Sequence, residues 1–132
     1  MENTFENEFV TFVMKNGLLY VVYKPVAEMT LEAAILVAEN RLELTNNVPQ
    51  YIIADVSNIK TSSKEAREYL SKQDGGLKGI RAGAFVSNKV YSYFILNLFL
   101  KIANPSIPAK FFSNIEDAEI WICNIRLEDL KN

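Results

Sequence analysis

The sequence predicts a single α/β domain with a mostly parallel central sheet, and three observations support this fold class. An uninterrupted apolar run from Tyr51 to Ala54 ends on Asp55 and leads through a serine-rich turn into a helix start. A strand without apolar and polar alternation is typical of a sheet covered on both faces. Strand-like and helix-like segments alternate along the chain. The 132 residues suit one domain, which at this size buries about two-thirds of its unfolded surface.

The expected sheet begins with a hairpin. Residues 9–14 and 18–23 are rich in β-branched and aromatic residues, and Asn16-Gly17 between them favours a type I′ turn. The two strands are therefore expected to be antiparallel neighbours, with one antiparallel strand at the edge of the sheet. The acidic and polar residues 1–7 are expected to be a flexible start to the single domain, 1–132.

Helices and parallel strands are expected to alternate after the hairpin. Thr30 can cap a helix from Leu31 to about Leu44, and the central strand covers Tyr51–Asp55. The remaining elements are expected at residues 63–72 (helix), 80–86 (strand), 87–104 (helix), 110–112 (strand) and 113–126 (helix). Right-handed crossovers turn this ββαβαβαβα order into a mostly parallel five-stranded sheet.

Composition excludes several classes of protein. A formal net charge of −2 and a pI near 5.2 argue against a nucleic-acid binder, which needs clustered basic residues. Cys123 is the lone cysteine, which is typical of a reducing compartment, and beside Trp121 it is expected to be a small core residue. The start is acidic where a signal peptide is basic, and the longest apolar stretch, 90–102, is too short for a membrane span. We expect a cytoplasmic protein.

Hydroxyl groups and one acid gather where the parallel strands are expected to end. The starts at Ser62 and Ser113 fit the capping box, because a Glu follows three residues later in each. Helix starts that share one sheet edge favour an anion, so this edge is the candidate switch or anion-binding site. Its residues are Asp55, Ser57, Ser62, Ser63 and Ser87. In the alternative interpretation, these serines only cap helices.

The candidate edge lacks the groups that catalysis needs. Asp55 could be a phosphoacceptor or a metal ligand, but no acidic pair follows the first strand to hold Mg²⁺. An Asx turn, with Asp55 accepting backbone N–H groups near Ser57 and Asn58, is the structural interpretation. The sequence contains no histidine and no Walker, Cys-x-x-Cys or Gly-x-Ser-x-Gly motif. We therefore expect no enzymatic activity, no metal and no cofactor.

The expected helix at 87–104 is apolar on two sides. Beside its core face, which includes Phe94 and Leu98, a second apolar strip consists of Tyr93, Leu96 and Leu100. Three interpretations remain open for the strip: coverage by the chain itself, self-association, or contact with a lipid or other apolar ligand. We expect a homodimer, because soluble monomers rarely expose an apolar patch of this size.

Replacement of both Leu96 and Leu100 with glutamate should then yield a folded monomer, because two charges on each copy would face each other across the two-fold axis. Light scattering of the wild type and the double variant measures the difference. A wild type that is already monomeric at high micromolar concentration would contradict the dimer.

Several of these motifs together resemble a known family. They are the Pro49-x-x-Ile-Ile-Ala-Asp55 run, the Ser/Thr-rich turn, Ala66-Arg67, the Phe111-Phe112 strand and the Ala118…Trp121 ending. With the element order, they are similar to the STAS-like proteins of the anti-sigma-factor antagonist fold, and to small bacterial members in particular. The similarity covers about residues 9–125.

The resemblance implies a regulatory role. In regulatory members, an Asp-Ser-Ser-Gly-type motif carries a serine that a partner kinase phosphorylates, and here Ser62 or Ser63 falls near that place. Thr61 replaces the acid of the motif, Lys64 replaces its glycine, and the turn is about two residues shorter. We expect a non-catalytic interaction or regulatory module whose protein partner is unknown. The alternative is a carrier of a small apolar or lipid ligand, since the sheet order also resembles CRAL-TRIO domains, and an enclosed apolar pocket of several hundred Å³ would favour it.

Overall fold

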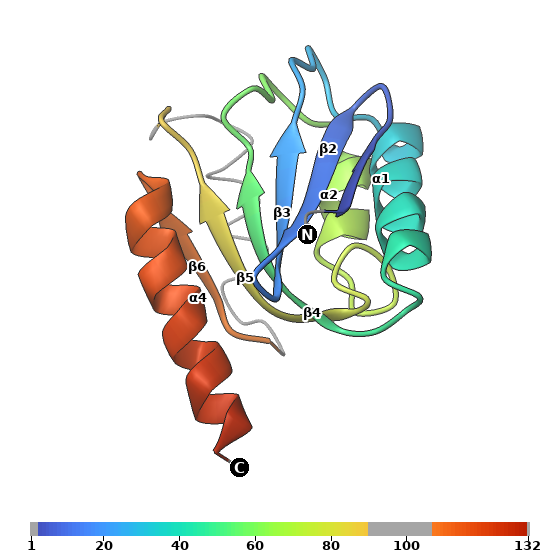
Figure 1. Ribbon diagram of the computed structural model, residues 1–132. Coiled ribbons are helices and arrows are strands. Elements are labelled where there is room, and N and C mark those ends of the chain that lie inside the picture. Colours follow the sequence, from blue (N-terminus) through green and yellow to red (C-terminus); the bar gives the residue numbers. More distant parts are fainter. Residues whose placement is uncertain (1–2, 90–106, 132) are drawn as a thin grey trace.

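The computed structural model describes residues 3–89 and 107–131 of the chain (Figure 1). In this part of the chain, six strands form one sheet in the order β1-β2-β3-β4-β5-β6. The strands are β1 (Asn3–Glu6), β2 (Val10–Lys15), β3 (Leu18–Tyr23), β4 (Gln50–Asp55), β5 (Ile80–Val86) and β6 (Ala109–Phe112). The helices are α1 (Leu31–Leu44), α2 (Lys64–Leu70) and α4 (Ile115–Leu130). Because β3, β4, β5 and β6 run parallel, the α/β prediction is confirmed.

The hairpin predicted from Asn16-Gly17 joins β2 to β3. Both residues have positive φ angles, 54° for Asn16 and 80° for Gly17, as a type I′ turn requires. The strands on either side pair antiparallel, with Lys15 opposite Leu18. The turn therefore sets the register that puts Leu19 and Val21 on the face with the larger buried cluster, and Leu18 on the other face.

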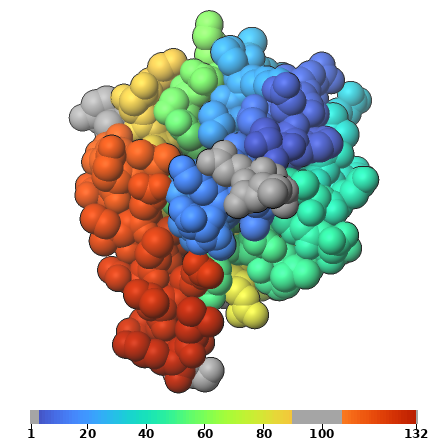
Figure 2. All heavy atoms as spheres, viewed as in Figure 1, coloured from blue at the N-terminus to red at the C-terminus, as the bar shows by residue number. Residues whose placement is uncertain are grey.

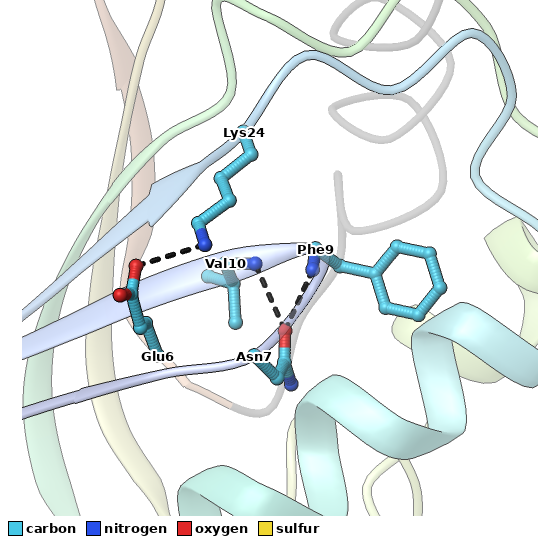
Figure 3. A network of polar contacts seen from close by, with 5 residues as sticks. All are labelled: Glu6, Asn7, Phe9, Val10 and Lys24. Carbon is cyan, nitrogen blue, oxygen red and sulfur yellow. Dashed lines mark hydrogen bonds and ion pairs between the residues drawn. The ribbon is translucent and has the colours of Figure 1, made fainter.

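The prediction of five strands was wrong, because the first residues form a sixth strand, β1, in the described part of the chain. β1 pairs antiparallel with β2, so the antiparallel strand β2 is not at the edge of the sheet. The Asn7 side chain closes the turn by accepting hydrogen bonds from the N–H groups of Phe9 (2.7 Å) and Val10 (3.0 Å) (Figure 3). Glu6 also forms a 2.8 Å ion pair with Lys24. These contacts attach β1 and the turn after it to the rest of the sheet.

The described helices lie on opposite faces of the sheet (Figure 1). α1 and α2 cover one face, where the larger buried cluster includes Phe12, Leu19 and Ile52. α4 lies on the other face over a smaller cluster, which includes Ile53 and Ala84. Neighbouring residues of β4 thus enter different clusters, which explains why its sequence is continuously apolar.

α4 contacts the sheet through a narrow stripe of its surface. Ala118 and Ile122 are fully buried, while Leu127 and Leu130 are exposed and the end of the helix projects beyond the body of the domain (Figure 2). Cys123 is exposed, which corrects the expectation of a core residue, because it lies beside the buried stripe. Polar contacts complete the attachment, since Tyr20 donates to Glu119 (2.5 Å), Tyr51 to Asp129 (2.6 Å) and Arg126 to the carbonyl of Asn16 (3.0 Å).

Part of the prediction lies outside the described residues. Most of the expected helix at 87–104 does so, including Tyr93, Leu96 and Leu100, and the dimer interface therefore stays a prediction. None of the helices in the described ranges has the length and hydrophobicity of a membrane span.

Candidate functional site at the carboxyl edge of the sheet

The carboxyl ends of β4, β5 and β6 meet at one edge of the sheet. The N–H of Val56 donates to the carbonyl of Val86 at 2.9 Å, and the N–H of Ser87 donates to the carbonyl of Phe112 at 3.1 Å. The parallel ladder thus continues for one residue beyond each strand. This continuation brings together the turn that contains Asp55 and Ser57 and the turn that contains Ser87.

Two hydrogen bonds that involve the side chains of Asp55 and Ser57 connect these two turns. The Oδ1 atom of Asp55 accepts the N–H of Ser57 at 3.0 Å, which is the geometry of an Asx turn. The Oγ atom of Ser57 in turn accepts the N–H of Asn88 at 3.1 Å. Ser57 is 8% exposed, so its hydroxyl is a buried support for the loop after β5.

Asp55 should therefore be replaceable by asparagine without loss of fold. Asparagine keeps the acceptor oxygen, so the free energy of unfolding should hardly change, whereas Asp55→Ala should lower it by about 1 kcal/mol because the Ser57 N–H loses its partner. Urea unfolding of the two variants measures this difference. Formation of a Mg²⁺-dependent acyl phosphate that Asp55→Asn abolishes would instead show that the carboxylate performs chemistry.

The hydroxyl group of Ser87 forms its hydrogen bonds within its own turn. The side chain is fully buried, and its Oγ atom accepts the N–H of Lys89 at 2.9 Å and lies 3.3 Å from the Lys89 carbonyl oxygen, to which it can donate. Both hydrogen-bonding functions of the hydroxyl are thus used within three residues. Ser87 holds the loop and presents no free hydroxyl to solvent.

Ser62 and Ser63 lie farther along the chain, where the segment before α1 pairs with the segment before α2. Met29 and Ser62 form a parallel bridge, and the N–H of Ser63 donates to the Met29 carbonyl at 3.0 Å. Ser62 is 6% exposed, and the guanidinium group of Arg67 donates to its carbonyl at 2.6 Å. Ser62 is therefore part of a buried backbone connection.

The helix caps lie one residue later than the sequence predicted. The Oγ atom of Ser63, not Ser62, accepts the N–H of Ala66 and caps α2. Asn114, not Ser113, caps α4 by accepting the N–H of Asp117. Each predicted cap has a second polar residue beside it. At α2, the bridge to Met29 places Ser62 in extended backbone before the helix.

Ser63→Ala should lower the free energy of unfolding by about 1 kcal/mol, because the first turn of α2 loses its capping acceptor. Ser63→Asp should be nearly neutral, since aspartate also caps a helix. Ser62→Ala is the matched control, because the one polar contact of its Oγ atom within the described residues is 3.4 Å from Arg67. A larger loss for Ser62→Ala than for Ser63→Ala, measured by urea unfolding, would show that the cap is assigned wrongly.

The surface around these buried groups is polar and open. In the segments that follow β4 and β5, the exposed residues are Asn58, Lys60, Thr61, Asn88 and Lys89. The side chain of Asn58 donates to the carbonyl of Tyr23 at 3.3 Å, which also fixes the end of β3. Among the described residues, no group of three or more His, Cys, Asp or Glu side chains could hold a metal ion. This edge can present a shaped polar surface to a partner.

Arg41 is a notable buried residue that the sequence analysis did not single out. In α1, Leu31 is exposed, and the buried positions are Ala33, Ala34, Val37, Ala38 and Arg41. The spacing of Val37, Ala38 and Arg41 is helical, so a wheel centred on the alanines would have placed Arg41 inside.

Comparison with solved structures identifies the fold. The structure is similar to the crystal structure of an uncharacterized protein from the DUF3478 family of Shewanella loihica PV-4, which is described as having a SpoIIAA-like fold. The TM-score is 0.59 and the sequence identity is 17%, over 93% of this chain and 96% of that chain. The protein therefore has a SpoIIAA-like, or STAS-like, fold, and the resemblance seen in the sequence is confirmed.

The family is shown by the sequence itself. The family model described as "Domain of unknown function (DUF7793)" matches residues 12–126, so the chain belongs to this family. No curated protein matches the sequence. The matched range begins in β2 and ends in α4, and it therefore contains the whole candidate edge.

Proposed function

We propose that this protein is a non-catalytic regulatory module of STAS-like type that binds a partner protein through the carboxyl edge of its sheet. The proposal rests on two hydrogen bonds, one between Asp55 and Ser57 and one between Ser57 and Asn88. Together they hold the loops after β4 and β5 against each other. Buried polar groups that support loop shape are suited to recognition, because a preorganised surface loses little freedom on binding. The STAS-like fold agrees with this role.

The exposed residues of the edge supply the proposed contact surface. Thr61 and Asn88 offer neutral hydrogen-bonding groups, and Lys60 and Lys89 add positive charge. A polar surface of this kind is typical of interfaces that form and dissociate. Self-association and a cytoplasmic location are part of the same proposal and rest on the sequence.

We propose that phosphorylation of Ser63 regulates the edge. Ser57, Ser62 and Ser87 are buried, whereas Ser63 is half-buried and begins a helix. A kinase could reach the Ser63 hydroxyl with the least disturbance of the edge. Mass spectrometry of protein from its native cells should find phosphoserine at Ser63 if this regulation operates, and phosphate on a different serine would contradict the assignment.

Affinity purification with charge-reversed variants tests the contact surface. The variant Lys60→Glu/Lys89→Glu changes the edge, and Lys72→Glu/Lys78→Glu is the matched control, because its two lysines are exposed in the connection before β5. Proteins recovered from native cells with the wild type should be retained by the control and reduced at least tenfold by the edge variant. Equal recovery with both variants would contradict an interface at the carboxyl edge.

The lipid carrier is less well supported. The apolar pocket between the sheet and its helices has a cavity volume of about 60 Å³ in the described structure. A site for a drug-sized or larger ligand is typically about 300 Å³ or more. A pocket of the observed size is too small to enclose a lipid, which favours the interaction module.

A further inference from the structure

Arg41 is a buried cation near the end of α1. The residue is 4% exposed, and its Nη2 atom donates to the carbonyl oxygen of Gly76 at 3.1 Å. Its Nη1 atom is buried and has no hydrogen-bond partner in the part of the chain that the structure describes. Burial lowers the pKa of Arg41, yet a guanidinium group stays protonated in proteins. The structure thus contains a buried positive charge that is only partly satisfied, which is unfavourable without an anion.

The Nη1 atom belongs to a side chain that lines the small pocket between the sheet and the helices α1 and α2. Most of the other lining residues are apolar, and they include Val37, Ala38, Ile52, Leu70, Leu77 and Phe85. The cavity volume of about 60 Å³ is several times the roughly 10–15 Å³ that a single water requires. The pocket therefore combines room for a few heavy atoms, a mostly apolar wall and a lining side chain that carries an unpaired cationic donor.

Tyr23 is a second polar group of the pocket wall. No hydrogen bond to its hydroxyl is found among the described residues, and the residue is 8% exposed. Burial raises the pKa of Tyr23 to about 12, although the nearby Arg41 opposes the shift. The phenol is therefore neutral at physiological pH and can donate its proton to an acceptor in the pocket.

We propose that this pocket binds a small carboxylate with a short apolar chain. The carboxylate accepts from Nη1 of Arg41, with Tyr23 as a further donor, and the chain lies against the aliphatic wall. A single negative charge matches the single cation, whereas a phosphate would bury excess charge in an apolar site. The small volume excludes long acyl chains.

The proposed site adjoins the carboxyl edge through Ala54 and Val56 but uses none of the polar side chains of that edge. Asp55, Ser57, Ser62, Ser63 and Ser87 are not among the residues that line the pocket. Ligand binding can therefore be measured without a partner protein, and its failure would leave the proposed interaction surface untouched.

Methyl NMR titration of the full chain with sodium butanoate tests the site. Saturable shifts are expected for the methyl groups of Val37, Leu70 and Leu77. Butan-1-ol should bind at least tenfold more weakly because it lacks the charge, and butylammonium and inorganic phosphate should not bind there. If butanoate causes no saturable shift in the wild type, water alone fills the pocket and the proposal is wrong. Equal binding of butanoate and phosphate would overturn the role of the apolar wall.

Three variants locate the binding. Arg41→Met keeps a long side chain without the charge and should weaken butanoate binding at least tenfold, whereas the exposed Arg81→Met should leave it unchanged. Gly83→Val places methyl groups into the pocket, where the nearest atom to an added Cβ is 3.5 Å away, and should also abolish binding. Unchanged binding in Arg41→Met would overturn the proposal. Should that variant not fold, the wild-type titration and Gly83→Val decide the question.

Discussion

Replacement of Ile122 with alanine should lower the free energy of unfolding by about 2–5 kcal/mol, because a fully buried side chain is removed and a cavity remains. The position is sensitive because α4 has only two fully buried residues, Ala118 and Ile122. On the α4 side of the sheet, the buried cluster is also the smaller of the two. The neighbouring side chains cannot fill the cavity unless the whole helix moves.

Ile120→Ala is the matched control for this prediction. Ile120 is on the same helix but is 63% exposed, so removal of the same atoms should change the free energy of unfolding by less than about 0.5 kcal/mol. Urea unfolding followed by circular dichroism measures both variants. Equal losses would show that α4 does not pack on the sheet as described.

Gly76→Ala should also be strongly destabilising, by about 3 kcal/mol, since it forces extra volume into a closely packed turn. An added Cβ would lie 2.4 Å from Cα of Leu70 and 2.7 Å from its carbonyl oxygen, and these are backbone atoms that cannot rotate away. Any shift of Gly76 also moves the carbonyl that accepts the Arg41 hydrogen bond. The clash therefore affects both the turn after α2 and the buried guanidinium.

Gly83→Ala provides the comparison for Gly76. The nearest atom to a Cβ at Gly83 is 3.5 Å away and belongs to a side chain, so this substitution should cost little. Thermal unfolding of the two variants should show a much lower midpoint for Gly76→Ala alone. Similar midpoints would mean that the turn after α2 is looser than the structure shows.

The sequence predicts those elements whose local pattern and tertiary environment agree. The structure confirms the type I′ turn at Asn16-Gly17, the helix Leu31–Leu44 after Thr30 and the strand Ile80–Val86. In each case, a turn residue, a cap or an apolar run in the local sequence marks the element. The parallel arrangement followed from these elements, because right-handed crossovers leave few alternatives.

Elements that depend on tertiary contacts could not be predicted from local pattern. Four residues, Asn3–Glu6, are too few to show a period, and the strand forms because Phe5 stacks on Phe12 and Asn7 closes the turn. Ser63 caps α2 in place of the predicted Ser62, because the pairing of Ser62 with Met29 fixes the backbone before the helix.

The hydrogen bonds of the candidate edge were predicted only in part. Asp55 was expected to form an Asx turn, and its bond to Ser57 is present. The link from Ser57 to Asn88 joins residues 31 positions apart, so no local motif could indicate it. The orientation of Arg41 similarly depends on how α1 is rotated about its axis relative to the sheet. The sequence does not determine this rotation, because the helix packs through small residues such as Ala33 and Ala38.

Site-specific photo-cross-linking in native cells tests the central claim, binding of a partner through the carboxyl edge, most directly. A benzophenone side chain would replace Thr61 or Asn88 at the edge and, as controls, Lys72 or Lys78, all four of which are exposed. We predict that the edge positions cross-link to a discrete partner polypeptide and that the control positions do not. Cross-links that form at positions 72 and 78 but are missing at positions 61 and 88 would contradict an interface at this edge.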